Sequence, residues 1–281
     1  IQRRGLEVRS AAFGTFVVNA VASDNPADLG QADLVLFTVK TYDLDQAAQV
    51  AAQVLAPGGC LLTFQNGLEA PDQVAAIVGK QRVLIGTSGL ETTILEPGVI
   101  GHLSTWHFVT VSEMDGPPTP RVEAVVEAMR AAGINASVAA DGRRALWEKA
   151  WALIPLATIT AVCRAPIGAI RDLPETRALA LTLLDEVSAV ARAYGYEAPE
   201  AHQRALGLLE GAAGGMKASM ARDFERGQRT ELEALTGALV RLAAARGVDV
   251  PASRAAYAIL KLRLIVEAGA EKPVGAAADG R

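Results

Sequence analysis

Asp33-Leu34-Val35-Leu36-Phe37-Thr38-Val39-Lys40 is a nearly continuous apolar run that ends in a lysine. Because polar residues do not alternate along it, the run predicts a strand buried on both faces, as in a parallel sheet covered by helices. A helical pattern over Asp43 to Leu55 follows almost directly. Strand followed by helix favours an α/β fold for this part of the chain.

The rest of the chain divides into two patterns. Further strands are predicted at residues 6–9, 16–21, 59–64, 82–86 and 106–111, and further helices at residues 72–78 and 121–132. After Asp141 only helical periodicity remains, at residues 177–194, 201–210, 216–225, 230–246 and 252–268. We therefore predict an α/β domain over residues 1–140 followed by an all-α domain over residues 141–281. The Gly- and Ala-rich tail, residues 271–281, is expected to fray.

Composition excludes several classes of protein. The net charge of the 281 residues is -4 and aromatic residues make up 5%, which argues against a nucleic-acid surface. No apolar run reaches the roughly 18 residues of a membrane span, and residues 1–20 do not resemble a signal peptide, so we expect a cytoplasmic protein without membrane contact. Cys60 and Cys163 form no CxxC, and His102, His107 and His202 lack metal-ligand spacing. No disulfide or metal site is predicted.

An α/β sheet followed by a helical domain is the plan of many nicotinamide-dependent reductases, yet the chain contains no GxGxxG loop. Such a loop should follow the first strand and hold the cofactor's pyrophosphate at a helix N-terminus. We expect the first strand, helix and strand of the domain to lie before Ile1, and a domain lacking them would expose a sheet edge. The residue that distinguishes NADP from NAD would also lie there, so the sequence leaves that choice open.

Lys149 stands on an otherwise apolar helix, Ala145 to Leu153. A buried ammonium needs a carboxylate, a ligand or a route to solvent, or it loses its proton. Taken alone, the pattern favours a lysine that snorkels beside Glu148. Its role therefore depends on what other residues accompany it.

Five motifs in order and spacing resemble the ketopantoate reductase (2-dehydropantoate 2-reductase) family. They are Asp33 to Lys40, Gln65-Asn66-Gly67, Leu146 to Lys149, Ser219-Met220 and Thr230 to Glu233. The resemblance covers nearly the whole chain. It implies a Rossmann-type N-terminal domain, a helical C-terminal domain, an active site in the cleft between them, NADPH as hydride donor and a place in pantothenate biosynthesis.

The same resemblance implies roles for individual residues. Lys149 would be the catalytic general acid that bonds the substrate carbonyl oxygen. Asn66 would lie beside the nicotinamide and the substrate, although Asn-Gly is also an ordinary turn. Ser219 would bind the substrate carboxylate. His102 is interpreted as a structural strand histidine.

Three more residues would lie near the cofactor. Glu231 would also lie near Lys149; by itself, Thr230-Glu231 is more simply a helix start with Thr230 as its cap. Lys40 matches a cofactor-proximal lysine, but it is also compatible with a solvated charge at a strand end. Thr92 would approach the nicotinamide through its backbone.

Departures from the family concern the substrate. Leu153, Ala157 and Ile167 stand where family members have asparagines that contact the substrate, and Pro155 inside the helix is expected to kink it. An apolar wall discriminates weakly between substrates and prefers those with apolar side chains.

The default hypothesis is NADPH-dependent reduction of 2-dehydropantoate. A D-2-hydroxyacid dehydrogenase acting on branched or aromatic 2-oxo acids and a non-catalytic binding protein of the same fold stay open, as does a homodimer.

Overall fold

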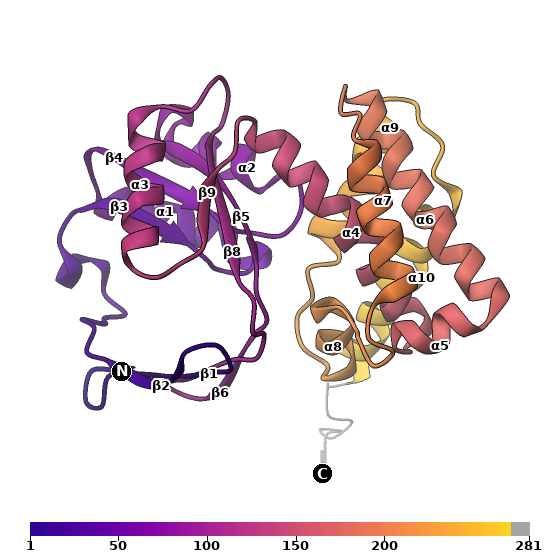
Figure 1. Cartoon of the computed structure of the whole chain (residues 1–281), viewed down its shortest axis with the longest axis horizontal. Helices are drawn as coiled ribbons and strands as arrows, with labels where there is room; N and C mark the ends of the chain where they lie inside the picture. The colour runs from indigo at the N-terminus through magenta and orange to yellow at the C-terminus, as the bar shows by residue number, and fades with distance from the viewer. Residues whose placement is uncertain (271–281) are drawn as a thin grey trace, which may run out of the picture. The chain divides into compact units, whose positions relative to one another are not determined.

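The computed structural model describes residues 1–270, and the expected fraying of residues 271–281 lies outside them (Figure 1). The chain packs as two compact units, Ile1–Leu146 and Trp147 onward. The division falls inside helix α4 (Gly142–Cys163), a little later than the boundary predicted at residues 140 and 141. The first unit is α/β and the second is helical, so the predicted fold class is confirmed.

A five-stranded sheet forms the centre of the α/β unit. Its strands are β3 (Ala32–Phe37), β4 (Leu55–Thr63), β5 (Val83–Gly89), β8 (Phe108–Glu113) and β9 (Ala136–Val138), in that spatial order. β3, β4 and β5 are parallel, as the apolar runs predict. β8 is antiparallel to β5, which the sequence did not indicate. No helix connects β5 to β8, and an antiparallel neighbour needs no helical crossover.

Helices cover both faces of this sheet (Figure 1). α3 (Pro120–Ala131) packs its buried valines and Met129 against Cys60, Leu62, Leu84 and Val111. α1 (Leu44–Val54) and α2 (Ala70–Val78) pack together against the opposite face. β3 is an edge strand of the sheet, and the side chain of Leu36 on it is 51% exposed.

A second, smaller sheet corrects the expectation of one sheet. It consists of β2 (Gly14–Val18), β1 (Leu6–Ser10), β7 (Val99–His102) and β6 (Thr92–Glu96), in that order. β1 and β2, predicted as strands, belong here and pair antiparallel. β6 and β7 were missed because each is short and their turn at Pro97-Gly98 masks the alternation; Gly98 has φ 86°, where glycine is favoured.

The helical unit contains helices in each predicted stretch, although a π-helical turn forms the start of the one predicted over residues 230–246, and it adds one short helix. After α4 come α5 (Ile167–Asp172), α6 (Pro174–Ala193), α7 (Pro199–Gly211), α8 (Ser219–Glu225), a π-helical turn (Glu233–Gly237), α9 (Ala238–Ala245) and α10 (Pro251–Ala270). Proline opens α6, α7 and α10, where its missing N–H costs nothing. α5 was missed because six residues are too few to show a period.

α4 is the core helix of this unit. Trp151, Ile154 and Ile159 on it are almost fully buried, and the helix runs without interruption through Pro155. By length and composition alone α4 could cross a membrane, yet 67% of its most apolar window is buried inside the protein. Buried core helices pass the same test, and we interpret α4 as one.

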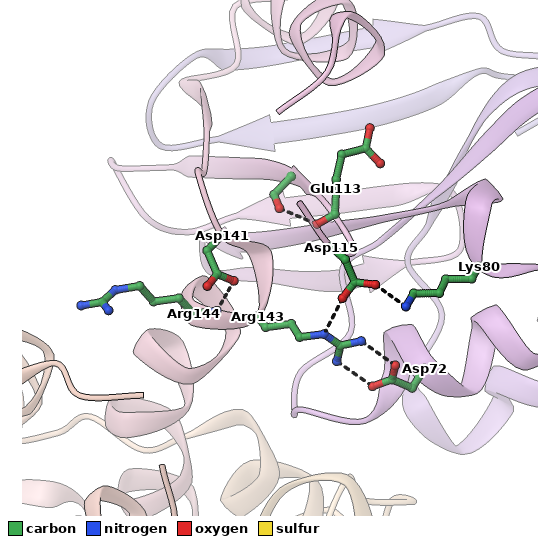
Figure 2. Close-up of polar contacts among 8 residues, drawn as sticks. Asp72, Lys80, Glu113, Asp115, Asp141, Arg143 and Arg144 are labelled. Carbon is green, nitrogen blue, oxygen red and sulfur yellow. Dashed lines mark hydrogen bonds and ion pairs between the residues drawn. The ribbon is translucent and has the colours of Figure 1, made fainter. Parts of the chain in front are cut away.

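The first turn of α4 is anchored to the α/β unit by Arg143. Figure 2 shows its guanidinium between Asp72 at the start of α2, with nitrogen to oxygen distances of 2.8 and 2.7 Å, and Asp115, at 3.4 Å. Asp115 also pairs with Lys80. The fork geometry of arginine suits a carboxylate, so this group fixes where α4 begins.

Candidate active site

Lys149 and Glu231 interact within the helical unit. Lys149 is half-buried on α4 and is flanked in the chain by the buried residues Trp147, Ala150 and Trp151. Burial lowers the pKa of its ammonium to about 8, and the negative charge of Glu231 opposes this shift. Glu231 is itself only 4% exposed. A lysine with these surroundings can release its proton close to neutral pH, and a buried carboxylate interacts with it.

The chain around Glu231 is not a regular helix. The backbone oxygen of Glu231 accepts from Ala234 and Leu235, and the N–H of Gly237 then reaches back to Leu232 at 2.9 Å, a π-type turn. Thr230 Oγ1 accepts from the N–H of Leu232 at 3.4 Å. This contact supports the interpretation of Thr230 as a local cap, which stands beside the functional role predicted for Glu231. π-helical turns are rare and are often found at functional sites.

A buried hydroxyl pair ties this turn to α4. Thr158 Oγ1 on α4 and Thr236 Oγ1 in the π-helical turn lie 2.7 Å apart, and both residues are fully buried. α4, which carries Lys149, is thus hydrogen-bonded to the turn that begins two residues after Glu231. Ser219 lies in the same unit, half-buried at the first position of α8.

The three candidate residues of the α/β unit follow the ends of neighbouring parallel strands. Lys40 follows β3, Asn66 follows β4, and Thr92 comes shortly after β5. Since these strands run in the same direction, their carboxyl ends share one edge of the sheet, where α/β proteins bind ligands. Lys40 and Asn66 are half-buried, whereas Thr92 is exposed and opens β6 opposite His102.

Gln65 belongs with these residues, although the sequence interpretation gave it no role. Its side chain is buried, and Nε2 donates to the backbone oxygens of Phe37 at 2.8 Å and Val39 at 3.0 Å. The one feature of the sequence that points to Gln65 is its place beside Asn66 in the Gln65-Asn66-Gly67 motif.

His102 has the surroundings of a structural histidine. It is buried, Nδ1 lies 2.9 Å from Ser10 Oγ, and Nε2 lies 3.2 Å from Ser104 Oγ. Ser104 donates its own proton to the backbone oxygen of Trp106, so the histidine N–H must sit on Nε2. This arrangement joins β1, β7 and the segment that leads to β8.

The apolar replacements expected to line a substrate pocket differ in their placement. Ala157 and Ile167 are fully buried, and only Leu153 is half-buried. Ile167 is also held by its N–H, which donates to the oxygen of Met216. Two of the three replacements thus fill the core of the helical unit.

Metal ligands are not clustered in the part of the chain that the structure describes. Within residues 1–270 there is no group of three or more His, Cys, Asp or Glu side chains that could hold an ion. Cys60 is buried and Cys163 is half-buried, and burial raises the pKa of both thiols. The prediction of a metal-free site stays a prediction.

Two family models match the chain. Residues 1–116 match ketopantoate reductase PanE/ApbA, and residues 141–263 match the C-terminal part of the same family. A 2-dehydropantoate 2-reductase of Halobacterium salinarum is 29% identical over 262 residues, which is 93% of this chain and 86% of the relative. Another, of Archaeoglobus fulgidus, is 32% identical over 241 residues, covering 85% of this chain and 78% of the relative.

Solved structures agree with these relatives. A PanE/ApbA family ketopantoate reductase from Ralstonia eutropha superposes with a TM-score of 0.86 at 28% identity, covering 94% of this chain and 86% of that one. Two more distant neighbours share the fold. They are a D-mandelate dehydrogenase with NADH and anilino(oxo)acetate (TM-score 0.83, 16% identity, 95% and 87% covered) and a dimeric ketopantoate reductase from Staphylococcus aureus (TM-score 0.78, 21% identity, 93% and 87% covered).

Proposed function

Because the chain belongs to the ketopantoate reductase family, we propose that it reduces a 2-oxo acid, by default 2-dehydropantoate, to the 2-hydroxy acid with NADPH as hydride donor. The observation that carries the proposal is Lys149, a half-buried lysine whose pKa is lowered to about 8 beside the buried Glu231. A surface lysine has no physical cause for so low a pKa. A lysine that protonates a carbonyl oxygen works best when its pKa lies near the working pH.

Reduction of a 2-oxo acid adds a hydride to the carbonyl carbon and a proton to its oxygen. NADPH, when bound, supplies the hydride. The Lys149 ammonium donates a hydrogen bond to the carbonyl oxygen, stabilises the negative charge that develops there and then transfers its proton to it. Glu231 favours the charged lysine by its own negative charge and so keeps the donor loaded. Solvent reprotonates the neutral amine after each turnover.

The other candidate residues bind and orient. We assign Lys40, Asn66, Thr92 and Glu231 to the cofactor, and Asn66 and Ser219 to the substrate together with Lys149. The residues of the α/β unit suit a nicotinamide dinucleotide because Lys40 and Asn66 offer a cation and an amide where two neighbouring parallel strands end, and Thr92 comes shortly after the third strand. The NADH in the D-mandelate dehydrogenase neighbour supports a pyridine nucleotide; the preference for NADPH rests on the family resemblance.

A second candidate substrate class is favoured by Leu153. This half-buried leucine offers an apolar contact where the family resemblance expects a polar one, which suits branched or aromatic 2-oxo acids. The protein would then act as a D-2-hydroxyacid dehydrogenase. The buried Ala157 and Ile167 support this alternative less, because both fill the core.

The test is NADPH oxidation with 2-dehydropantoate, 2-oxoisovalerate, 2-oxoisocaproate and phenylpyruvate, repeated with NADH. The highest kcat/KM for 2-dehydropantoate supports the default proposal. A preference for phenylpyruvate replaces it with the dehydrogenase alternative. Binding of neither nucleotide, with no turnover of any 2-oxo acid, leaves the non-catalytic alternative and ends both enzyme proposals.

We also propose that the protein acts in the cytoplasm as a homodimer. The dimeric neighbour from Staphylococcus aureus supports the dimer, and so does an apolar stripe on α10. Ile259, Leu262, Ile265 and Val266 recur at helical spacing there, and each is more than half exposed. An exposed apolar stripe of this kind is suited to a symmetric contact between identical subunits.

A further inference from the structure

Gln65 extends the pairing of β3 with β4 beyond the point where the backbones can do so. Phe37 and Thr63 are the last residues in register, and the N–H of Phe64 donates to the oxygen of Phe37 at 3.1 Å. Beyond that point the side-chain amide of Gln65 takes over. Its Nε2 donates to Phe37 O at 2.8 Å and to Val39 O at 3.0 Å, so one group bridges two carbonyls of the neighbouring strand end.

The hydrogen bonds of Gln65 act on the backbone next to both candidate cofactor residues, Lys40 and Asn66. The carbonyl of Val39 belongs to the peptide that leads into Lys40, and Gln65 is bonded directly to Asn66. A peptide is planar, so holding the Val39 oxygen also fixes the direction of the Lys40 N–H, which points the opposite way. The single amide of Gln65 therefore restrains the backbone immediately before both residues.

Stability alone does not account for this glutamine. Oε1 of Gln65 is buried and has no hydrogen-bond partner, and an unpaired buried acceptor destabilises a fold. Both Nε2 hydrogens face carbonyl oxygens, which settles the orientation of the amide. The arrangement keeps two donors directed at the strand ends and leaves an acceptor unpaired. A methionine of similar length would avoid the unpaired acceptor but could not hold Val39.

We infer that Gln65 is a positioning residue for cofactor binding, because its amide holds the Lys40 and Asn66 backbones at the carboxyl edge of the sheet. The inference rests on the proposed function, which assigns Lys40 and Asn66 to the cofactor. Gln65 acts through these two residues and takes no part in proton transfer. Its loss should therefore weaken binding of the nucleotide and leave the titration of Lys149, in the other unit, unchanged.

The test compares Gln65→Met with the matched control Thr63→Val. Thr63 is the last residue of β4, two positions before Gln65, and is also buried. Its hydroxyl donates to the backbone oxygen of Leu84 on β5 and not to the carbonyls before Lys40. NADPH affinity is measured by fluorescence titration, and backbone order by hydrogen exchange of residues 38–43 and 64–69. If Gln65→Met does not fold, Gln65→Asn, which keeps the amide but shortens its reach, takes its place.

Gln65→Met should raise the Kd for NADPH about tenfold and speed hydrogen exchange in both segments. The kcat at saturating NADPH, and the pKa that limits kcat at alkaline pH, should hardly change. Thr63→Val should leave the Kd and the exchange near wild type. An unchanged Kd in Gln65→Met, or an equal rise in both variants, overturns the inference while the proposed function stands. If the wild-type protein binds neither NADPH nor NADH, the proposed function fails and the inference fails with it.

Discussion

Lys149 lowers the folding stability of the protein at neutral pH. Its pKa is about 8 in the folded chain, against 10.5 for an ordinary lysine. Below pH 8 the folded state must hold a charge that burial disfavours. Between pH 8 and 10.5 the unfolded chain binds more protons than the folded one, so stability rises with pH in this window.

Lys149→Met should therefore act in opposite directions on activity and stability. We expect kcat to fall roughly 10²–10⁴-fold through loss of the general acid. The free energy of unfolding at pH 7 should rise by about 1–2 kcal/mol, since the lysine is only half-buried and part of its penalty is screened by solvent. Steady-state kinetics and urea denaturation measure the two effects. Lys261→Met, at an exposed position, is the control, and near wild-type turnover in Lys149→Met would rule out the role of the lysine.

Glu231 partly offsets the effect of burial on the pKa of Lys149. Its negative charge raises the pKa of the lysine against the effect of burial, so Glu231→Gln should move that pKa below about 8. In the reduction direction the alkaline limb of kcat/KM should then move to lower pH, because the donor loses its proton earlier. The pH dependence of kcat/KM measures this. Glu225→Gln, which removes a carboxylate paired with Lys217, should leave the limb in place; a shift to higher pH in Glu231→Gln would contradict the assignment.

Residue types were easier to interpret from the sequence than residue surroundings. A lysine among apolar neighbours on α4 was visible in the pattern, and the structure adds its interaction with Glu231. The resemblance predicts Ala157 and Ile167 at the substrate, and the structure buries both almost completely. Burial depends on which distant elements pack against a position, and short-range patterns do not contain that information. The same limit hid Gln65, whose partners lie on another strand.

At the scale of elements, α4 depends on Arg143 for its start. Arg143→Gln removes the paired contact with Asp72 and the contact with Asp115. Because these groups are partly exposed, we expect a loss of about 0.5–1.5 kcal/mol in the free energy of unfolding, measured by urea denaturation. Arg144→Gln changes the neighbouring exposed side chain and should cost less than about 0.5 kcal/mol. Equal losses in the two variants would show that the anchor contributes nothing specific.

The elements that were predicted well are the long ones with a clear period. α1, α3, α6 and α10 lie within one to three residues of their predicted bounds at most ends. The periodicity predicts one helix over residues 230–246 and gives no sign of the π-helical turn. In the structure the N–H of Gly237 donates to the oxygen of Leu232, five residues earlier. Periodicity barely distinguishes a π-turn from an α-helix, since one extra residue shifts the apolar stripe only locally. β6 and β7 were lost for a related reason, being too short to show alternation.

For the whole molecule, measuring the oligomeric state tests directly whether the apolar stripe on α10 forms the dimer contact. Leu262→Glu places a charge at the middle of the stripe and should convert a dimer into monomers. Sedimentation velocity at several concentrations measures this. Leu173→Glu changes another leucine of the helical unit that is more than half exposed and should leave the dimer intact. A wild-type protein that is monomeric throughout the concentration range would refute the proposed dimer.

The division into an α/β half and a helical half was predictable because it changes the hydrophobic period over long stretches of chain. The second sheet was not, since it pairs β1 with β7, which lie about ninety residues apart in the sequence. The family resemblance predicts site residues at distant positions that no local pattern connects. Of these, the structure shows Lys149 and Glu231 to interact.

The low pKa of Lys149 also makes it a nucleophile. At pH 7 a lysine with a pKa near 8 carries on the order of a hundred times more free amine than an ordinary lysine. Free amines condense with carbonyl compounds to imines, and the proposed substrates are carbonyl compounds. A side chain suited to protonate a 2-oxo acid is thus also suited to trap one covalently. Aldehydes and borohydride would modify this lysine ahead of the others and mark it chemically.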